Sequence, residues 1–313
     1  MLAIGVDIGG TKIAAGVVDE DGRLLASTRR DTDPEDPAAI EDSVADAVEE
    51  LRRDHEVGVV GVSAAGFVGR DRSTVVFAAN IAWRDYPLGE VLRQRLALPV
   101  VVENDANAAG WAEFRFGAGR DVEDMIMLTV GTGLGGAIVT DGRLLRGASG
   151  AGAEVGHLRV VPNGRACGCG HDGCLERYVS GTALVRETRA ALETDPDRAA
   201  HLIGLAEGKP KRVTGPMVTQ AAKEGDQFAV DMLAELGRWL GTGMAALSAV
   251  LDPALYVVGG GVCEAGDLLL EPAREALDQQ LFARGRRPLP TIVIAELGND
   301  AGIVGAADLA RSH

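Results

Sequence analysis

Three of the four cysteines of this chain fall within eight residues, and a histidine precedes them at a spacing that suits a metal site. His157 lies ten residues before Cys167, and Cys169 and Cys174 follow. Thiolate and imidazole are ligands that Zn²⁺ prefers, and closed sites of three cysteines and one histidine are usually structural. We therefore predict a zinc site that stiffens a loop, with His171 as an alternative to His157 as the fourth ligand.

Other roles for these cysteines are burial as small apolar side chains or pairing as disulfides. Cys167 and Cys169 are too close along the chain for an easy mutual disulfide, and the remaining cysteine, Cys263, is distant in sequence. A glutamate stands at each end of the cysteine segment. We expect the stiffened loop to position these two side chains, Glu154 and Glu176.

Three glycine clusters follow apolar segments and are candidates for binding a nucleotide. Glycines let backbone N–H groups approach phosphate oxygens closely, and an acidic residue beside them would face a metal-bound water. Structural turns and packing glycines are the ordinary alternatives. The clusters are Asp7, Gly9, Gly10, Thr11 and Lys12, then Gly131, Thr132 and Gly133 up to Gly136, and finally Gly259, Gly260 and Gly261.

Asn104 and Asp105 stand where a short apolar strand at 99–102 gives way to a helix that ends near Phe116. Both residue types are favoured at helix N-caps, so capping is one interpretation. The other is catalysis, because phosphoryl transfer needs a group that orients and deprotonates the attacking hydroxyl, and an aspartate commonly does so. In that interpretation Asp105 is the base and Asn104 holds a neighbouring hydroxyl.

The pentapeptide Asp-Gly-Arg-Leu-Leu occurs twice, at 21–25 and at 141–145. Each copy follows an apolar strand, a glycine-rich turn and a second strand, and the copies are 120 residues apart. This pattern predicts a duplicated β-hairpin unit and two related domains.

Strands alternate with helices along the rest of the chain, which predicts an α/β fold with mixed sheets. Apolar residues at helical spacing predict a long core helix over about 226–250. We further expect helices at 37–54 and 87–96, strands at 57–64, 255–258 and 291–295, a short hairpin at 68–77, a loop at 80–86 and a last helix from about 300.

The composition is that of an ordinary enzyme of 313 residues, with 31 basic and 46 acidic side chains and a formal charge of −15. This acidity argues against a general nucleic-acid or anionic-membrane binder, since phosphate contacts need clustered Lys and Arg. Asp7 interrupts the first apolar run, and we expect neither a signal peptide nor a membrane span. Thiols at metal-like spacing then suggest a reducing cytoplasm.

Together these motifs resemble the ROK family of repressors, open reading frames and sugar kinases. The glycine clusters match the family's phosphate and adenosine motifs. Glu154-x-Gly-His157 and the cysteine segment ending in Glu176 match its sugar and zinc signature. The resemblance runs from residue 4 to about 308. It implies a two-domain actin-like (ribonuclease H-like) fold with a cleft, divided into residues 1–110 plus 300–313 and residues 111–299.

The resemblance also implies a site and an activity. It implies ATP with Mg²⁺ in the cleft, two glycine loops facing each other across it, and homodimers or homotetramers. The implied reaction is phosphorylation of D-glucose, with fructose, mannose or N-acetylmannosamine as alternative acceptors and polyphosphate as an alternative donor. The residues implied to hold the sugar are Gly66, Asn80, Asn104, Asp105, Glu154, His157 and Glu176.

Two functions of other classes are weaker interpretations. A sugar-responsive repressor of the same family would carry a helix-turn-helix ahead of Asp7, where the sequence leaves no room, and its net charge is unsuitable. An ATPase of the heat-shock type is disfavoured by the zinc segment and by the carboxylates that flank it.

Overall fold

The first sheet combines a meander of three strands with two parallel strands. The structure, a computed structural model, describes residues 1–10 and 12–312, and the predicted site residue Thr11 lies outside them. The order β3-β2-β1-β4-β8 has antiparallel β3-β2 and β2-β1 pairs and parallel β1-β4 and β4-β8 pairs. The strands are β1 (Ala3–Ile8), β2 (Lys12–Val18), β3 (Leu24–Asp31), β4 (Val59–Ala64) and β8 (Val100–Asn104).

A second five-stranded sheet repeats this arrangement, with the order β11-β10-β9-β12-β13. Its outer hairpin β10-β11 is antiparallel, and the β9-β12 and β12-β13 pairs are parallel. The strands are β9 (Met125–Val130), β10 (Leu134–Thr140), β11 (Arg143–Leu144), β12 (Leu255–Gly259) and β13 (Thr291–Ile294). The predicted α/β class with mixed sheets is confirmed, and the shared strand order bears out the predicted duplication.

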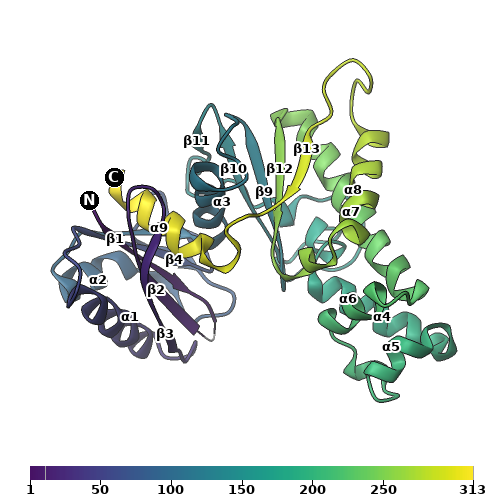
Figure 1. The fold of residues 1–313 in the computed structure, drawn as a ribbon, viewed down its shortest axis with the longest axis horizontal. Helices are drawn as coiled ribbons and strands as arrows, with labels where there is room; N and C mark the ends of the chain where they lie inside the picture. Colours follow the sequence, from purple (N-terminus) through teal and green to yellow (C-terminus); the bar gives the residue numbers. More distant parts are fainter. Residues whose placement is uncertain (11, 313) are drawn as a thin grey trace. The chain divides into compact units, whose positions relative to one another are not determined.

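Helices cover both faces of the first sheet, because its central strands are apolar on both sides. Alternate residues of β1, such as Ile4 and Val6, pack against α1 (Pro37–Arg52) and α2 (Leu88–Leu96). The opposite face packs against α9 (Ala301–Arg311) and α3 (Asp105–Phe116). Figure 1 shows α1 and α9 on opposite sides of this sheet. Each fully buried aliphatic side chain contributes about 1.5–3 kcal/mol to such a core.

Glycines allow α9 to lie unusually close to the first sheet. A Cβ atom on Gly5 would stand 1.8 Å from the carbonyl oxygen of Ile303, and one on Gly61 would stand 1.9 Å from that of Ala306. Neither distance is physically possible, so any side chain at these positions would push α9 away. The middle of β1 and the middle of β4 therefore lie directly against the last helix of the chain.

A small third sheet lies between β4 and α2 in the sequence. It has the order β5-β6-β7, with β5 at Phe67–Val68, β6 at Val75–Phe77 and β7 at Arg84–Tyr86. The predicted hairpin at 68–77 is present, but the predicted loop at 80–86 ends in strand β7, which pairs with β6. The polar residues of β7 lack the apolar alternation that identifies strands from sequence.

The remaining helices follow β11 or connect the strands of the second sheet. The predicted long core helix is α7 (Gln227–Leu251), which packs closely on α8 (Asp267–Gln280) (Figure 1). A Cβ atom on Gly241 would stand 2.2 Å from the carbonyl oxygen of Ala273, which shows how near the two backbones are. Three further helices, α4 (Gly181–Thr194), α5 (Ala200–Leu205) and α6 (Gly215–Lys223), precede α7 in the chain, and α4 and α6 pack on it.

The chain divides into two compact units. The first contains Met1–Glu123, Ala137–Ala153 and Ala295–His313, and the second contains Asp124–Gly136 and Glu154–Ile294. This division differs from the expected boundary at residue 110, which falls inside α3. Because α3 packs on α9 through Ala108 and Gly305, the whole helix stays with the first unit.

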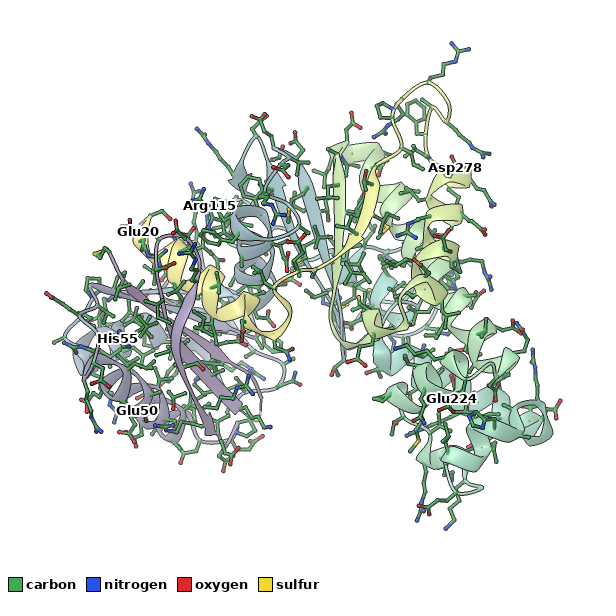
Figure 2. All side chains as sticks on the ribbon, in the orientation of Figure 1. Glu20, Glu50, His55, Arg115, Glu224 and Asp278 are labelled. Atoms are coloured by element: carbon green, nitrogen blue, oxygen red, sulfur yellow. The ribbon has the colours of Figure 1, made fainter. Side chains whose placement is uncertain are left out.

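Several acidic side chains at the surface have basic partners. Glu20, Glu50 and Glu224, labelled in Figure 2, are exposed and pair with the N-terminal amine, Arg30 and His201 respectively. Exposed pairs of this kind contribute little to stability. Among the helices of residues 1–10 and 12–312, none combines the length and the apolar character that a bilayer crossing requires.

Candidate active site

Asn104 caps helix α3 and also fixes the residues around it. Its Oδ1 accepts a hydrogen bond from the backbone N–H of Asn107 at 2.9 Å, which is the N-cap interaction. Its Nδ2 donates to the carbonyl oxygen of Gly66 at 3.1 Å and to Oδ1 of Asp105 at 2.9 Å. The amide group therefore joins the predicted sugar residues Gly66, Asn104 and Asp105 into one group at the end of β8.

Asp105 occupies the first turn of α3, where partial positive charge at a helix N-terminus favours a carboxylate. Its Oδ1 also accepts the backbone N–H of Ala106 at 2.9 Å. The two interpretations of this dipeptide are therefore divided between its residues. Asn104 is the cap, and Asp105 is held in a defined position beside it.

Asp7 and the first glycine turn stand at the end of β1. The Ser63 hydroxyl donates to Oδ1 of Asp7 at 2.8 Å, and burial raises the pKa of Asp7 although this hydrogen bond opposes the shift. A nearby cation would stabilise the ionised form of such a buried carboxylate. For this reason Asp7 is a suitable residue to hold a hydrated magnesium ion.

The turn itself is closed by a hydrogen bond from the N–H of Gly9 to the carbonyl oxygen of Lys12, at 2.9 Å. The N–H of Gly9 is therefore engaged within the turn, and phosphate contact there falls to the other backbone N–H groups. A Cβ atom on Gly10 would lie 3.8 Å from the Cβ of Asn80. The predicted phosphate turn and the predicted sugar residue Asn80 are thus neighbours in the first unit.

The four predicted zinc ligands come together in the second unit. The ligand atoms of His157, Cys167, Cys169 and Cys174 all lie within 4.8 Å of one another. Sγ of Cys167 is 3.8 Å from Nδ1 of His157, and Sγ of Cys169 is 3.6 Å from Sγ of Cys174. Ligands held about 2.0–2.3 Å from one zinc ion in a tetrahedron are separated by similar distances.

His171 serves this loop through its backbone. Its carbonyl oxygen accepts the N–H of Cys167 at 2.8 Å, and its N–H lowers the pKa of the Cys169 thiol. Burial raises the pKa of Cys174 to about 12, so this thiol needs a metal or another cation to become a thiolate. The cluster found within residues 1–10 and 12–312 includes His157 and not His171, which favours the first of the two ligand sets.

The segments on either side of the cysteines meet at the start of β10. Glu176 accepts the backbone N–H of Leu134 on Oε2 at 3.0 Å. Gly156 lies so close to Leu134 that a Cβ atom would stand 2.3 Å from its carbonyl oxygen. Burial raises the pKa of Glu154, nearby His157 opposes this shift, and the charge of Glu176 reinforces it. These carboxylates and His157 therefore form an electrostatically connected group.

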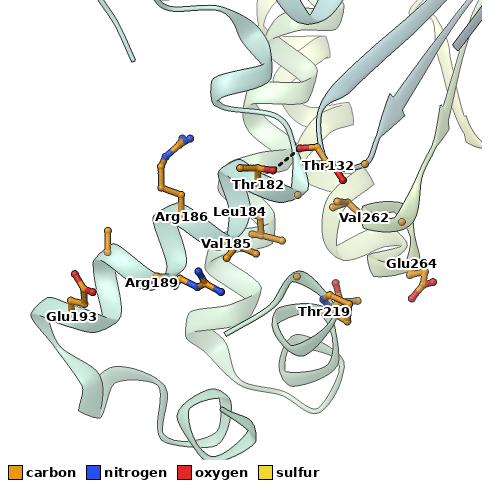
Figure 3. A pocket seen from close by; sticks show the side chains of 16 residues that line it. Thr132, Thr182, Leu184, Val185, Arg186, Arg189, Glu193, Thr219, Val262 and Glu264 are labelled. Carbon is orange, nitrogen blue, oxygen red and sulfur yellow. Dashed lines mark hydrogen bonds between the residues drawn. The ribbon is translucent and has the colours of Figure 1, made fainter. Parts of the chain in front are cut away.

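A cavity of about 920 Å³ opens beside the second glycine turn (Figure 3). Helix α4 begins there: the N–H of Gly181 donates to the carbonyl oxygen of Gly131 at 2.7 Å, and Oγ1 of Thr182 donates to that of Thr132 at 2.7 Å. Ser180 caps this helix through the N–H of Ala183 at 3.0 Å. A helix N-terminus beside a glycine turn favours an anion, and the volume suits a nucleotide.

The cavity includes some of the predicted nucleotide residues and several that the sequence did not indicate. Gly131, Thr132 and Gly261 line it. Gly133, Gly259 and Gly260 are absent from its lining; Gly260 has φ +90° and packs on the backbone of Val130. The unpredicted lining residues include Thr182, Leu184, Val185, Arg186, Arg189, Pro216, Thr219, Val262 and Glu264. The capping pattern at 180–182 was the available signal for α4.

Comparison with known proteins identifies the class. The model of the ROK family matches residues 3–313. The chain therefore belongs to the ROK family. It is 51% identical to the glucokinase of Streptomyces coelicolor over 310 residues, which cover 99% of this chain and 98% of that protein. It is 30% identical to the N-acetylmannosamine kinase of Escherichia fergusonii over 317 residues, covering 100% and 99%.

Solved structures agree with this assignment. The ROK family glucokinase from Streptomyces griseus, in complex with glucose and AMPPNP, is 50% identical, with a TM-score of 0.90 and 100% coverage of both chains. The ROK hexokinase from Thermus thermophilus is 35% identical, with a TM-score of 0.83 and coverage of 100% and 98%. The expected actin-like sugar kinase fold is confirmed.

Proposed function

We propose that this chain is a glucokinase that transfers the γ-phosphoryl group of ATP to the primary hydroxyl of D-glucose. The observation that carries the proposal is the match along nearly the whole chain, at 51% identity, to a glucokinase. The lower identity to N-acetylmannosamine kinases, 30–31%, favours glucose over that alternative acceptor. Fructose and mannose remain alternatives within the same site.

In this reaction Asp105 is the base. The hydroxyl oxygen of the sugar forms a bond to the γ-phosphorus, its proton passes to Asp105, and the bond from the γ-phosphorus to the bridging oxygen breaks to release ADP. Asn104 supports this role because its Nδ2 binds Oδ1 of Asp105 and leaves the carboxylate one orientation. Gly66, Asn80, Glu154, His157 and Glu176 are the proposed hydrogen-bond partners of the other sugar hydroxyls.

The nucleotide is proposed to occupy the cavity beside α4. Gly131 and Thr132 would face its phosphates together with the N-terminus of α4, and Gly261 would leave space for the ribose or base. Asp7 would hold a magnesium ion through water, and this ion would neutralise phosphate charge. We also propose that the turn from Gly9 to Lys12 and the glycines at 133, 259 and 260 shape the loops around the nucleotide. Thr11 is proposed as a nucleotide residue from its place in the sequence motif alone.

Zinc is proposed as a structural ion held by His157, Cys167, Cys169 and Cys174. All four positions would be protein ligands, so the ion would have no open position for a substrate. Its role would be to fix the ring of His157 and the segment that leads to Glu176. A homodimer or homotetramer and a cytoplasmic location remain predictions.

Coupled measurement of ADP release tests the proposed reaction. Purified protein is assayed with glucose, fructose, mannose and N-acetylmannosamine at several concentrations, with ATP or polyphosphate as donor. We expect the highest kcat/KM with glucose and ATP. A higher value with another sugar would reassign the acceptor, and phosphorylation by polyphosphate in the absence of ATP would extend the donor.

A further inference from the structure

Glu103 is a buried carboxylate to which the proposed reaction gives no role. It is the residue directly before Asn104 and Asp105, and its side chain is 5% exposed. Its Oε1 accepts the side-chain amide of Asn107 and the backbone N–H of Asn104, each at 3.2 Å. Glu103 therefore binds the start of α3 at two residues, Asn107 and Asn104. The amide group of Asn104 in turn contacts Asp105.

Two arginines from other segments reach the same carboxylate. Nε of Arg146 lies 2.7 Å from Oε2 of Glu103, whereas Nε of Arg72 lies 3.6 Å from it. The shorter contact is a charge-assisted hydrogen bond and the longer one is only an ion pair. Burial and the nearby charge of Arg146 lower the pKa of Arg72 to about 10, so Arg72 is charged at neutral pH. Arg146 is the stronger partner.

Arg72 connects Glu103 to the segment that carries Gly66. It stands in the turn between β5 and β6, and β5 begins one residue after Gly66. The carbonyl oxygen of Arg72 accepts the N–H of Val102 in β8 at 2.9 Å. This turn is thereby attached to the strand that ends in the proposed base.

Arg146 connects Glu103 to residues 146–153, which run directly into Glu154. The carbonyl oxygen of Arg146 accepts the N–H of Gly152 at 2.9 Å, and that of Ser149 accepts the N–H of Arg70 at 3.0 Å. A Cβ atom on Gly150 would stand 2.2 Å from the carbonyl oxygen of Val68. The segment is thus folded onto the β5–β6 turn, and Arg146 is its charged attachment to β8.

We propose that Glu103 and Arg146 are positioning residues for the sugar site, which together hold the start of α3, the β5–β6 turn and residues 146–153. The inference rests on the proposed function, because three of the proposed sugar residues, Gly66, Asp105 and Glu154, belong to or adjoin these segments. A buried ion pair is strongly disturbed when one partner is removed, since the other charge is left without compensation. Loss of Arg146 should therefore loosen the sugar site and leave the nucleotide cavity, which belongs to the second unit, intact.

Arg146→Ala, Arg146→Lys and the control Arg143→Ala test this inference. Arg143 is an exposed residue of β11, three positions before Arg146. Glucose and AMPPNP affinities are measured by titration calorimetry, and KM values by ADP release. We expect Arg146→Ala to weaken glucose binding and raise its KM by roughly tenfold to a hundredfold, with AMPPNP affinity within about twofold of the unchanged protein. Arg146→Lys should restore part of the loss, and Arg143→Ala should have no effect.

Hydrogen–deuterium exchange provides a reading that needs no catalysis. Amides of residues 146–153 should exchange faster in Arg146→Ala and in Glu103→Gln than in the unchanged protein, and those of α4 should not. Unchanged glucose affinity and unchanged exchange in folded Arg146→Ala would overturn the positioning role. Failure of the unchanged protein to phosphorylate any hexose would instead overturn the proposed function. The exchange result would still test whether Glu103 and Arg146 hold residues 146–153.

Discussion

Asp7 lies one residue before the end of β1, and the corresponding position near the end of β9 is Thr129. In register, Asp7 pairs with Ser63 of β4, whereas Thr129 pairs with Gly259 of β12. The first sheet thus presents a buried acid with a hydroxyl partner, and the second presents a threonine and a bare backbone. The two sheets share a strand order and differ in the side chains near the ends of the corresponding strands.

The same contrast recurs elsewhere in the two units. In the first, β8 ends in Glu103 and Asn104, and Asp105 begins α3. In the second, the turn after β9 is bound by the N-terminus of α4 and opens to the cavity. The comparison supports a division of work within the proposed reaction: in the first unit Asp105 would act on the acceptor hydroxyl, and in the second unit the glycine turn after β9 would offer backbone surface to the nucleotide.

The largest expected effect comes from the first unit. Asp105→Asn keeps the hydrogen bond from Asn104 to Oδ1 and removes the proton acceptor, so kcat should fall by about 10²–10⁴-fold with little change in AMPPNP affinity. Steady-state ADP release with both substrates saturating measures this change. Asp46→Asn, an exposed position on α1, is the matched control. A folded Asp105→Asn protein with nearly unchanged kcat would reduce Asp105 to a structural residue.

The next effect comes from the metal cluster of the second unit. The Cys169→Ala variant should bind no zinc. Its kcat/KM for glucose should fall about 10- to 100-fold, mainly because the KM for glucose rises, since the zinc ion would position sugar-binding residues without touching the sugar. Plasma emission spectroscopy should find about one zinc per chain in the unchanged protein and in Cys263→Ala, whose thiol donates to the carbonyl oxygen of Gly259. Active, unchelated protein without zinc would contradict a structural ion.

A smaller effect should follow from blocking the nucleotide cavity. A Cβ atom on Gly131 meets nothing within 4 Å, and Gly131 lines the cavity, so we expect Gly131→Val to place its side chain in space that the nucleotide would use. We expect the KM for ATP to rise roughly tenfold and the KM for glucose to stay nearly constant. Gly133→Val is the instructive comparison, because its Cβ atom would stand 2.4 Å from Oε2 of Glu176. Gly133→Val should weaken the binding of both substrates. If Gly131→Val weakened glucose binding alone, the assignment of the cavity to the nucleotide would be contradicted.

The smallest effect concerns stability at Asp7. Burial raises the folded-state pKa of this carboxyl above its unfolded value, so the contribution of Asp7 to stability is lost as pH rises through the folded pKa. Asp7→Asn carries no charge and should be more stable than the unchanged protein at pH 8, with a gain that shrinks as pH falls. Thermal unfolding between pH 5 and pH 8 measures this difference. The same variant should need a higher magnesium concentration for half-maximal activity. A stability gain that grows as the pH falls would contradict the raised pKa of Asp7.

Much of this division could be read from the sequence. The repeated pentapeptide indicated a duplicated hairpin unit, and the structure shows that the two sheets containing these hairpins also share a strand order. The types and spacing of His157 and the three cysteines indicated the cluster that the structure brings together. The Asn104–Asp105 pair was found because two chemistries compete for one helix start. These features depend on local spacing, which a sequence displays directly.

Other features depend on contacts between distant segments and left no local signal. Helix α4 lines the cavity because the N–H of Gly181 binds the carbonyl oxygen of Gly131, 50 residues earlier. The contact between Glu103 and Arg146 joins residues 43 apart in sequence, and the clash that Gly133→Val would make with Glu176 spans a similar distance. Strand β7 was missed because its side chains, Arg84 to Tyr86, are polar or half-exposed.

Titration calorimetry of two ligands against two variants tests the division of work most directly. Glucose and AMPPNP are each titrated into Arg146→Ala, which disturbs the first unit, and into Gly131→Val, which disturbs the cavity of the second. The account predicts a crossed pattern, in which Arg146→Ala loses glucose affinity and keeps AMPPNP affinity while Gly131→Val does the opposite. Equal loss of both ligands in both variants would contradict it.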